Sequence, residues 1–377
     1  MSKQMPVFVV ALLLALAGAV GATTLQEVEV TCPVCSLKFK VFEVMSTNSF
    51  GGQDTDFCVH AAGTPPDPYA VWTCPKCLYS GSAETFAKAV SEETKKKVLA
   101  ELKSPWPIKE DMSQKDIPGW VKFDLAASVA GWEGVGPADV AGLYLEASWA
   151  ARVEVERCFQ SLYSDPEKRA LFEDRSHVLA LIVQVLEEDA ALKPSLEAFR
   201  QAIDALWSQI FEGSAGEENR KDLDMKLAEA LLARVGEGKL PAEEAALEEF
   251  AAGAVYRVHG ENLLAIPILK KLRTSEALPA PFRTVAGNML ESIDVERRYQ
   301  RKFIETAKPV LDKNLLEGGK LAAYLYLVGE LHRRLGEPAE AASWYKKAIA
   351  CPDIPAEGRA MAEAQLKSLG LDAGAPK

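Results

Sequence analysis

Two short cysteine pairs are the residues of this sequence best suited to chemistry. The stretches T-C-P-V-C at 31–35 and T-C-P-K-C at 73–77 hold four of the seven cysteines. Two residues between cysteines let both sulfurs of a tight turn face one ion, and two such turns complete a tetrahedron around zinc. The proline after each first cysteine favours the turn. The predicted ligands of this structural zinc are Cys32, Cys35, Cys74 and Cys77.

Disulfides and redox chemistry are the alternative uses of the four cysteines. An oxidising compartment favours disulfides, but a C-x-x-C disulfide closes a very small loop and stabilises little. A redox dithiol is the other alternative, although no βαβ pattern surrounds either pair. Ser36 and Leu78 stand where many zinc knuckles have glycine, and the 38 residues from 36 to 73 must form an insertion. We expect zinc, with the other two uses left open.

Further metal-binding residue types lie between the two pairs. Cys58 and His60 could replace one knuckle ligand or form a second site. The alternative is a small buried thiol and a surface imidazole. Asp54 and Asp56 could bind a hard cation. Aspartate is also common in turns, so a turn beside the Gly-Gly pair explains both residues without a metal.

The motifs of common enzyme classes are missing from the sequence. It has no P-loop, H-E-x-x-H, G-x-S-x-G or strand-borne G-x-G-x-x-G motif, and its four histidines are widely scattered. A zinc ion with four thiolates leaves no position for a substrate. We therefore expect a protein that is not an enzyme. Its net charge of -11 repels phosphate backbones, so we expect no nucleic-acid binding.

The N-terminus is typical of an exported protein. Lys3 precedes the apolar run V-F-V-V-A-L-L-L-A-L-A, and small residues then continue to Ala22. This order predicts a signal peptide at 1–22, cleaved after Ala22, because the run is short for a membrane span. An uncleaved anchor and a buried helix are the competing interpretations. We expect a periplasmic or secreted protein with no membrane segment beyond the signal peptide.

Strands are predicted on both sides of the first cysteine pair. Apolar and polar residues alternate in L-Q-E-V-E-V before it and in K-F-K-V-F-E-V after it. Residues 23–81 are therefore expected to form a small cysteine-rich, zinc-ribbon-like β module. A single helix capped by Ser82 should follow and end at the S-P-W-P of 104–107, since proline cannot continue it. Residues 82–121 thus form a helix and a Pro/Trp connector.

Residues 122–370 are expected to be helical and to form repeats, with 371–377 as a tail. Asp165-Pro166 and Leu240-Pro241 are typical helix starts. The clearest repeat is 322–355, where small and aromatic residues recur at the offsets of a tetratricopeptide repeat. These residues are Gly329, Gly336, Ala341, Tyr345 and Ala348.

The same register continues upstream with weaker matches. Gly253 and Gly260 occupy matching places, and Gly287 follows Gly253 by 34 residues, which is one repeat length. The step from Gly287 to Gly329 is 42 residues, which predicts a loop insertion around residue 316. An ordinary Ala-rich helical bundle is the alternative to a repeat array.

Three stretches of the chain resemble a known family. They are C-P-V-C-S-L-K-F with D-T-D-F-C, then Y-A-V-W-T-C-P-K-C-L-Y-S, then K-F-D-L-A-A with A-G-L-Y-L-E-A-S-W. Together they resemble the bacterial domain-of-unknown-function family 2225 over roughly residues 31 to 152. The resemblance implies that the four paired cysteines act together and that Asp54 and Asp56 belong to the same small domain. It implies no activity.

The sequence as a whole predicts a mainly α protein, with a tetratricopeptide-like helical array behind the cysteine-rich β module. Such arrays expose a concave face that binds proteins or peptides. We expect an exported, non-enzymatic interaction scaffold or adaptor with a structural zinc. A thiol-disulfide or redox-sensing module that uses the same cysteines is the alternative.

Overall fold

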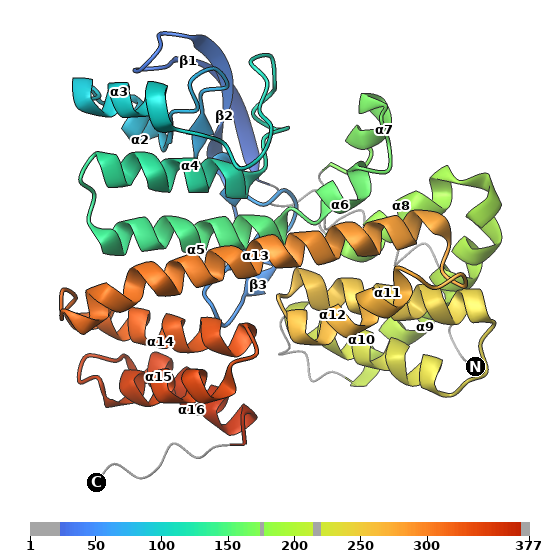
Figure 1. The fold of residues 1–377 in the computed structure, drawn as a ribbon. Helices are drawn as coiled ribbons and strands as arrows, with labels where there is room; N and C mark the ends of the chain where they lie inside the picture. The colour runs from blue at the N-terminus through green and yellow to red at the C-terminus, as the bar shows by residue number, and fades with distance from the viewer. Residues whose placement is uncertain (1–22, 174–176, 214–219, 371–377) are drawn as a thin grey trace.

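A computed structural model describes residues 23–173, 177–213 and 220–370 of the 377-residue chain (Figure 1). The predicted signal peptide at 1–22 and the tail at 371–377 lie outside the described residues. Within them, the chain is mainly helical and carries a small N-terminal β region, as the sequence predicts. No helix in the described part of the chain combines the length and apolar character needed to cross a bilayer.

Three antiparallel hairpins build the β module. The long hairpin joins β1 (Thr24–Thr31) to β2 (Lys38–Ser46), in the predicted strands, with Val28 opposite Val41. Two short hairpins join β3 (Gly52–Gln53) to β4 (Val59–His60) and β5 (Trp72–Thr73) to β6 (Ser80–Gly81). The 3-10 helix η1 (Asp67–Tyr69) lies between them in the chain.

The helix predicted from Ser82 to the connector is interrupted, so this prediction was wrong. Ser82 does cap α2 (Ala83–Phe86), but that helix ends after four residues and α3 (Glu92–Glu101) begins anew. The Ser91 side chain accepts a hydrogen bond from the Thr94 N–H and so caps α3. The break lets Val90 turn into the core of the module, where it is 7% exposed.

Six helices form a stack beneath the β module (Figure 1). Val129 and Trp132 of the first helix in the stack belong to the core of the module, so the two parts share one interior. The stack contains, in spatial order, α4 (Gly119–Trp132), α5 (Pro137–Val153), α13 (Ala280–Asp312), α14 (Gly318–Arg334), α15 (Pro338–Ala350) and α16 (Ala356–Ser368).

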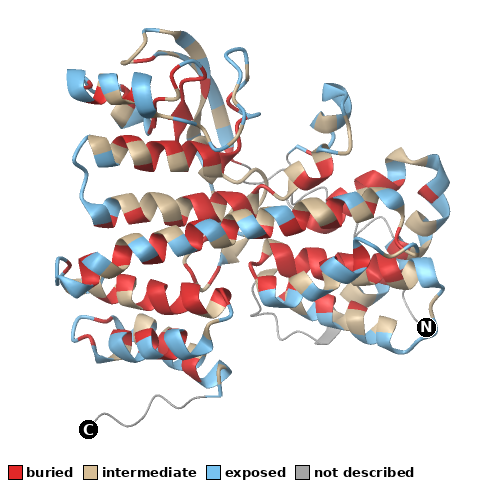
Figure 2. Cartoon of the chain, in the orientation of Figure 1, coloured by how far each residue is buried: buried red, intermediate tan, exposed pale blue. Residues whose placement is uncertain are grey.

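The helices that follow α5 and precede α13 in the chain form a second lobe beside the stack (Figure 1). The helix α13 runs through both lobes, and buried residues follow its inner face along its length (Figure 2). The elements of the second lobe are α6 (Glu156–Gln160), α7 (Pro166–Ala170), α8 (Val178–Glu188), η2 (Ala190–Leu192), α9 (Lys193–Gly213), α10 (Arg220–Gly236), α11 (Ala242–Val258) and α12 (Asn262–Leu272).

The clearest predicted repeat folds as a helical hairpin of α14 and α15. Gly336 lies in the turn with a φ of 80°, and Pro338 occupies the first turn of α15. A Cβ at Gly329 would lie 3.0 Å from the ring of Tyr345, so the glycine allows the two helices to approach closely. The weaker match upstream forms the corresponding hairpin of α11 and α12, with Gly260 in its turn.

The spacing between these hairpins does not follow a uniform repeat. The loop insertion predicted around residue 316 was wrong, because only residues 313–317 separate α13 from α14. The extra residues instead lengthen α13 to 33 residues. Gly287 lies within this helix, and a Cβ there would meet nothing within 4 Å. It therefore does not share the packing role of Gly329.

Candidate functional site

The four paired cysteines converge at the tips of two hairpins. Cys32 and Cys35 lie between β1 and β2, and Cys74 and Cys77 lie between β5 and β6. Their sulfur atoms all lie within 4.8 Å of one another. Cys32 Sγ is 3.5 Å from Cys77 Sγ, and Cys35 Sγ is 3.5 Å from Cys74 Sγ. A tetrahedron with metal–sulfur bonds of about 2.3 Å has edges of about 3.8 Å, so the cluster matches a four-thiolate metal site.

The two knuckles have the same backbone geometry. The N–H of Ser36 donates to the carbonyl of Cys32 at 3.0 Å, and the N–H of Leu78 donates to the carbonyl of Cys74 at 2.9 Å. The carbonyls of Leu37 and Tyr79 accept from the N–H groups of Cys32 and Cys74, both at 2.9 Å. Each of the two matching turns therefore directs its two sulfurs toward the same point, so that one ion can bind all four.

Hydrogen bonding within the cluster favours negative charge on Cys32 and keeps the proton on Cys74 and Cys77. Bonds from the thiols of Cys74 and Cys77 lower the pKa of Cys32, and further bonds from the backbone N–H groups of Cys35 and Val34 act in the same direction. The bond with Cys32 raises the pKa of Cys77 in turn. A bound cation would replace these thiol protons and leave four thiolates.

Both knuckles hold a residue other than glycine in a left-handed conformation. The φ angles are 61° for Ser36 and 67° for Leu78, the two positions where the sequence lacks the common glycine. Leu78 packs against the core around Ile117, so its side chain contributes burial that glycine would lose. Ser36 is exposed, so its side chain contributes no comparable burial.

Replacing Ser36 with glycine is expected to stabilise the module by about 1 kcal/mol, because glycine adopts positive φ without strain. Chemical denaturation of the metal-loaded protein measures the difference. Ser36→Ala is the matched control, since alanine keeps the Cβ and should not stabilise. Equal stabilities for the glycine and alanine variants would show that the positive φ carries no strain.

An acidic loop of the module reaches into the helical stack. Asp54 and Asp56, in the turn between β3 and β4, both contact Arg152 at the end of α5. The distances are 2.8 Å from Arg152 Nη1 to Asp54 Oδ2 and 2.6 Å from Arg152 Nη2 to Asp56 Oδ2. All three side chains are fully buried. From the sequence, a hard metal cation was a possible ligand of these two carboxylates. In the structure they form ion pairs with basic side chains of the protein instead.

Arg152 connects the module to α13. Its Nε and Nη2 atoms donate to Glu296 Oε1 at 3.0 and 2.6 Å, so all five of its N–H groups are hydrogen-bonded. The same Glu296 is paired with Arg257 of α11. One buried arginine thereby joins the module, α5 and α13, and the pairing continues into the second lobe.

Further contacts fasten the acidic loop to α10 and α14. Lys221 Nζ lies 2.8 Å from Asp54 Oδ1, and Arg334 Nη2 lies 3.4 Å from Asp56 Oδ1. Burial alone would raise the pKa of Asp56, but the Arg152 and Arg334 guanidiniums outweigh it and lower the pKa to about 2. The carboxylate is therefore ionised at neutral pH.

These partners were not predicted from the sequence, because Arg152, Glu296 and Arg334 are far apart along the chain. One signal was available. Glu296 interrupts the apolar face of α13 between Ile293 and Phe303, where the helical period calls for a core residue. A Cβ at Gly260 would collide with Arg152 and Arg334, so that glycine makes room for the buried charges.

Cys58 and His60 do not join the four-cysteine cluster. They group with Asp54, and the ligand atoms of these three residues lie within 4.8 Å of one another. Cys58 is fully buried, and its burial raises the pKa of its thiol well above the ordinary value. His60 Nε2 is 2.8 Å from Asp54 Oδ2, and 17% of its side chain is exposed.

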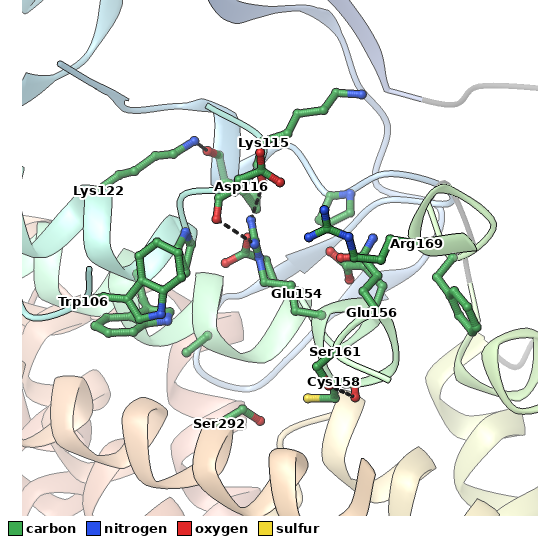
Figure 3. A pocket seen from close by; sticks show the side chains of 18 of the residues that line it. Trp106, Lys115, Asp116, Lys122, Glu154, Glu156, Cys158, Ser161, Arg169 and Ser292 are labelled. Carbon is green, nitrogen blue, oxygen red and sulfur yellow. Dashed lines mark hydrogen bonds and ion pairs between the residues drawn. The ribbon is translucent and has the colours of Figure 1, made fainter. Parts of the chain in front are cut away.

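A large cavity lies where the module, the connector and the helices meet (Figure 3). Its volume is about 1140 Å³. Trp106 lies on one side of the cavity, and Arg169 and Glu156 lie on the other (Figure 3). Further aromatic side chains come from η1, α4 and the α6–α7 region. These are Tyr69, Trp120 and Tyr163.

Charged groups of both signs line this cavity. Arg157 Nε donates to Glu154 Oε1 at 2.5 Å, whereas the buried Nε of Arg169 has no hydrogen-bond partner among the described residues. Burial and the nearby Glu154 raise the pKa of Glu156 to about 8. Lys122 Nζ donates to the carbonyl of Pro68 at 2.7 Å, which ties α4 to η1. The walls thus combine aromatic surface with polar groups able to bind a ligand.

The fold and the cysteine cluster define a class: a mainly α-helical protein with an N-terminal four-cysteine β module able to hold a metal ion. Residues 25–210 match the family described as "uncharacterized protein conserved in bacteria (DUF2225)". This match confirms the resemblance inferred from the C-P-x-C stretches. No curated protein and no solved structure matches the chain.

Proposed function

We propose that the protein is an exported, non-enzymatic scaffold whose N-terminal module is held by a structural zinc ion. Cysteine sulfur is a preferred zinc ligand, and a four-thiolate site is closed to substrates. The close approach of the four sulfurs supports this assignment. Export rests on the predicted signal peptide, and the mature chain would begin at Thr23.

The partner we propose is an extended peptide segment of another protein, bound in the cavity beside the module. The single observation that carries this proposal is the cavity itself, because its walls come from η1, the connector, α7 and α13 together. Its volume of about 1140 Å³ exceeds the range of roughly 300–1,000 Å³ typical of small-molecule pockets. Aromatic rings provide apolar contact, while Arg169 and Glu156 can pair with charged groups of a peptide.

Selection from a phage-displayed random peptide library on the metal-loaded protein tests this proposal. Trp106→Ala is expected to weaken binding of the selected peptides about tenfold, since buried aromatic side chains dominate peptide interfaces. Trp207→Ala, on α9 and away from the cavity, is the matched control. Peptides that bind both variants equally would place the interaction elsewhere and contradict the assignment to the cavity.

Thiol-disulfide exchange or redox sensing is the alternative, favoured by the approach of the sulfurs in two pairs at 3.5 Å. Metal content and free-thiol count on protein purified from its own compartment separate the two functions. Zinc with four protected thiolates supports the scaffold. A metal-free protein with these cysteines in two disulfides supports exchange.

A further inference from the structure

The hairpin of β3 and β4 brings a second set of metal-ligand types together. Gly52 pairs with His60 and Gln53 with Val59, and the N–H of Asp54 donates to the carbonyl of Cys58 at 2.8 Å. Cys58 comes directly before β4, and His60 is the last residue of that strand. Asp54 faces them across the turn, and the ligand atoms of the three residues lie within 4.8 Å.

A buried histidine adjoins this group. His259 is 5% exposed, and its ring lies against that of His60, with centroids 5.9 Å apart. His259 Nε2 is 3.0 Å from Asp224 Oδ2. Asp224 also accepts a hydrogen bond from Arg220 Nε at 3.0 Å, so its carboxylate acts as an acceptor toward its neighbours. His259 Nε2 therefore carries the proton.

The other ring nitrogen of His259, Nδ1, consequently has a free lone pair. This atom is buried and has no hydrogen-bond partner among the described residues. An unpaired buried nitrogen is costly to a fold. A histidine that donates one N–H to a carboxylate and keeps the other nitrogen free has the arrangement of a metal ligand.

The cations around Asp54 leave room for an ion. A carboxylate has about four lone-pair sites, and here Lys221 uses one on Oδ1 while Arg152 and His60 use Oδ2. An ion bound by Asp54 and His60 would replace only the proton between them. Arg152 and Lys221 would remain as hydrogen-bond donors that orient the ligating carboxylate.

We propose that Asp54, Cys58 and His60 hold a second metal ion, distinct from that of the four-cysteine cluster, and that the neighbouring His259, which lies outside this group of three, turns toward the ion as the fourth ligand. A set of one sulfur, two imidazole nitrogens and one carboxylate oxygen suits zinc or cobalt(II) in tetrahedral geometry. Binding displaces the thiol proton of Cys58 and the proton between His60 and Asp54. The ion would lie at the junction of the module with α10 and α11.

Cadmium-113 NMR on the stripped and reloaded full chain tests the proposal without a substitution. We expect two ions per chain and two separate resonances, because the shielding of cadmium falls with each thiolate ligand. A single resonance, of four-thiolate type, with one ion per chain would overturn the second site. A single resonance of mixed-ligand type would support it and contradict the four-cysteine site, so the two failures are distinguishable.

Cobalt(II) titration of variants assigns the ligands. Cys58→Ser is expected to remove one of two ions and to leave the four-thiolate absorption unchanged, whereas Cys158→Ser, another buried thiol, keeps both ions. Asp224→Asn, which keeps the proposed ligands but removes the carboxylate that pairs with His259, His177 and Arg220, should weaken the second site about 10- to 100-fold. Unchanged stoichiometry in Cys58→Ser together with unchanged affinity in Asp224→Asn would overturn the assignment. If Cys58→Ser does not fold, the Asp224→Asn affinity decides.

Discussion

Replacing Arg152 with methionine is expected to lower the free energy of unfolding by about 3–5 kcal/mol, the cost of removing one partner from a buried charge network. The substitution would remove the buried cation that Asp54, Asp56 and Glu296 share, and each carboxylate would keep only its remaining partners outside α5. Methionine has a similar length, so loss of packing contributes little. Urea denaturation of the metal-loaded variant measures the change.

Lys40→Met is the matched control for this substitution. Lys40 Nζ lies 2.6 Å from Glu27 Oε1, but both side chains are largely exposed. Exposed ion pairs contribute roughly 0–1 kcal/mol, so the control should have little effect. A comparable, small loss of unfolding free energy in both variants would mean that water screens the charges around Arg152. The network would then not stabilise the contact between the module and the helices.

Removal of the metal from the four-cysteine site is expected to unfold the β module and leave the helical stack folded. Apparent binding free energies of structural zinc are about 10–16 kcal/mol in small modules, where metal binding is also folding. Hydrogen exchange after chelation should show loss of protection over residues 23–81. Protection in α14 and α15 should persist, because their shared core contains no residue of the cluster.

Cys32→Ser and Cys351→Ser form the control pair for metal removal. Cys32 is a cluster residue, whereas Cys351 is equally buried at the end of α15. Only Cys32→Ser should reproduce the effect of chelation. Unchanged protection of residues 23–81 after chelation, with the knuckle thiols titrating as disulfides, would contradict the zinc assignment.

Local patterns of this sequence predict local structure well. The alternation around Cys32 and Cys35 gives the β1–β2 hairpin, because strand pairing across a tight turn depends on neighbouring residues. Gly336 and Pro338 likewise mark the turn between α14 and α15. The repeated C-P-x-C spacing predicts the convergence of the four sulfurs, since two identical knuckles can together supply the four ligands of one ion.

The rest depends on contacts between distant parts of the chain. The break before Ser91 exists because Val90 is buried by the module core, which no helical periodicity within 82–103 reveals. The length of α13 follows from its packing against both lobes. The pairing of Asp56 with Arg152 and Arg334 joins three segments that are far apart in the chain. In the sequence, the only sign of these ion pairs is the presence of charged residues on apolar helix faces.

The acidic loop also imposes an order on assembly of the chain. Thr55 and Arg334 are 279 residues apart in sequence, and Asp54 and Arg152 are 98 apart. A chain synthesised from its N-terminus completes the metal knuckles long before the last cations of the network exist. Asp54 and Asp56 can pair with Arg152 once α5 exists, but the contacts of the loop with Arg334 must wait until α14 is synthesised. The C-terminal hairpin thus closes the fold, and a chain that stops short of Arg334 retains its cysteines but leaves the loop without its last partner.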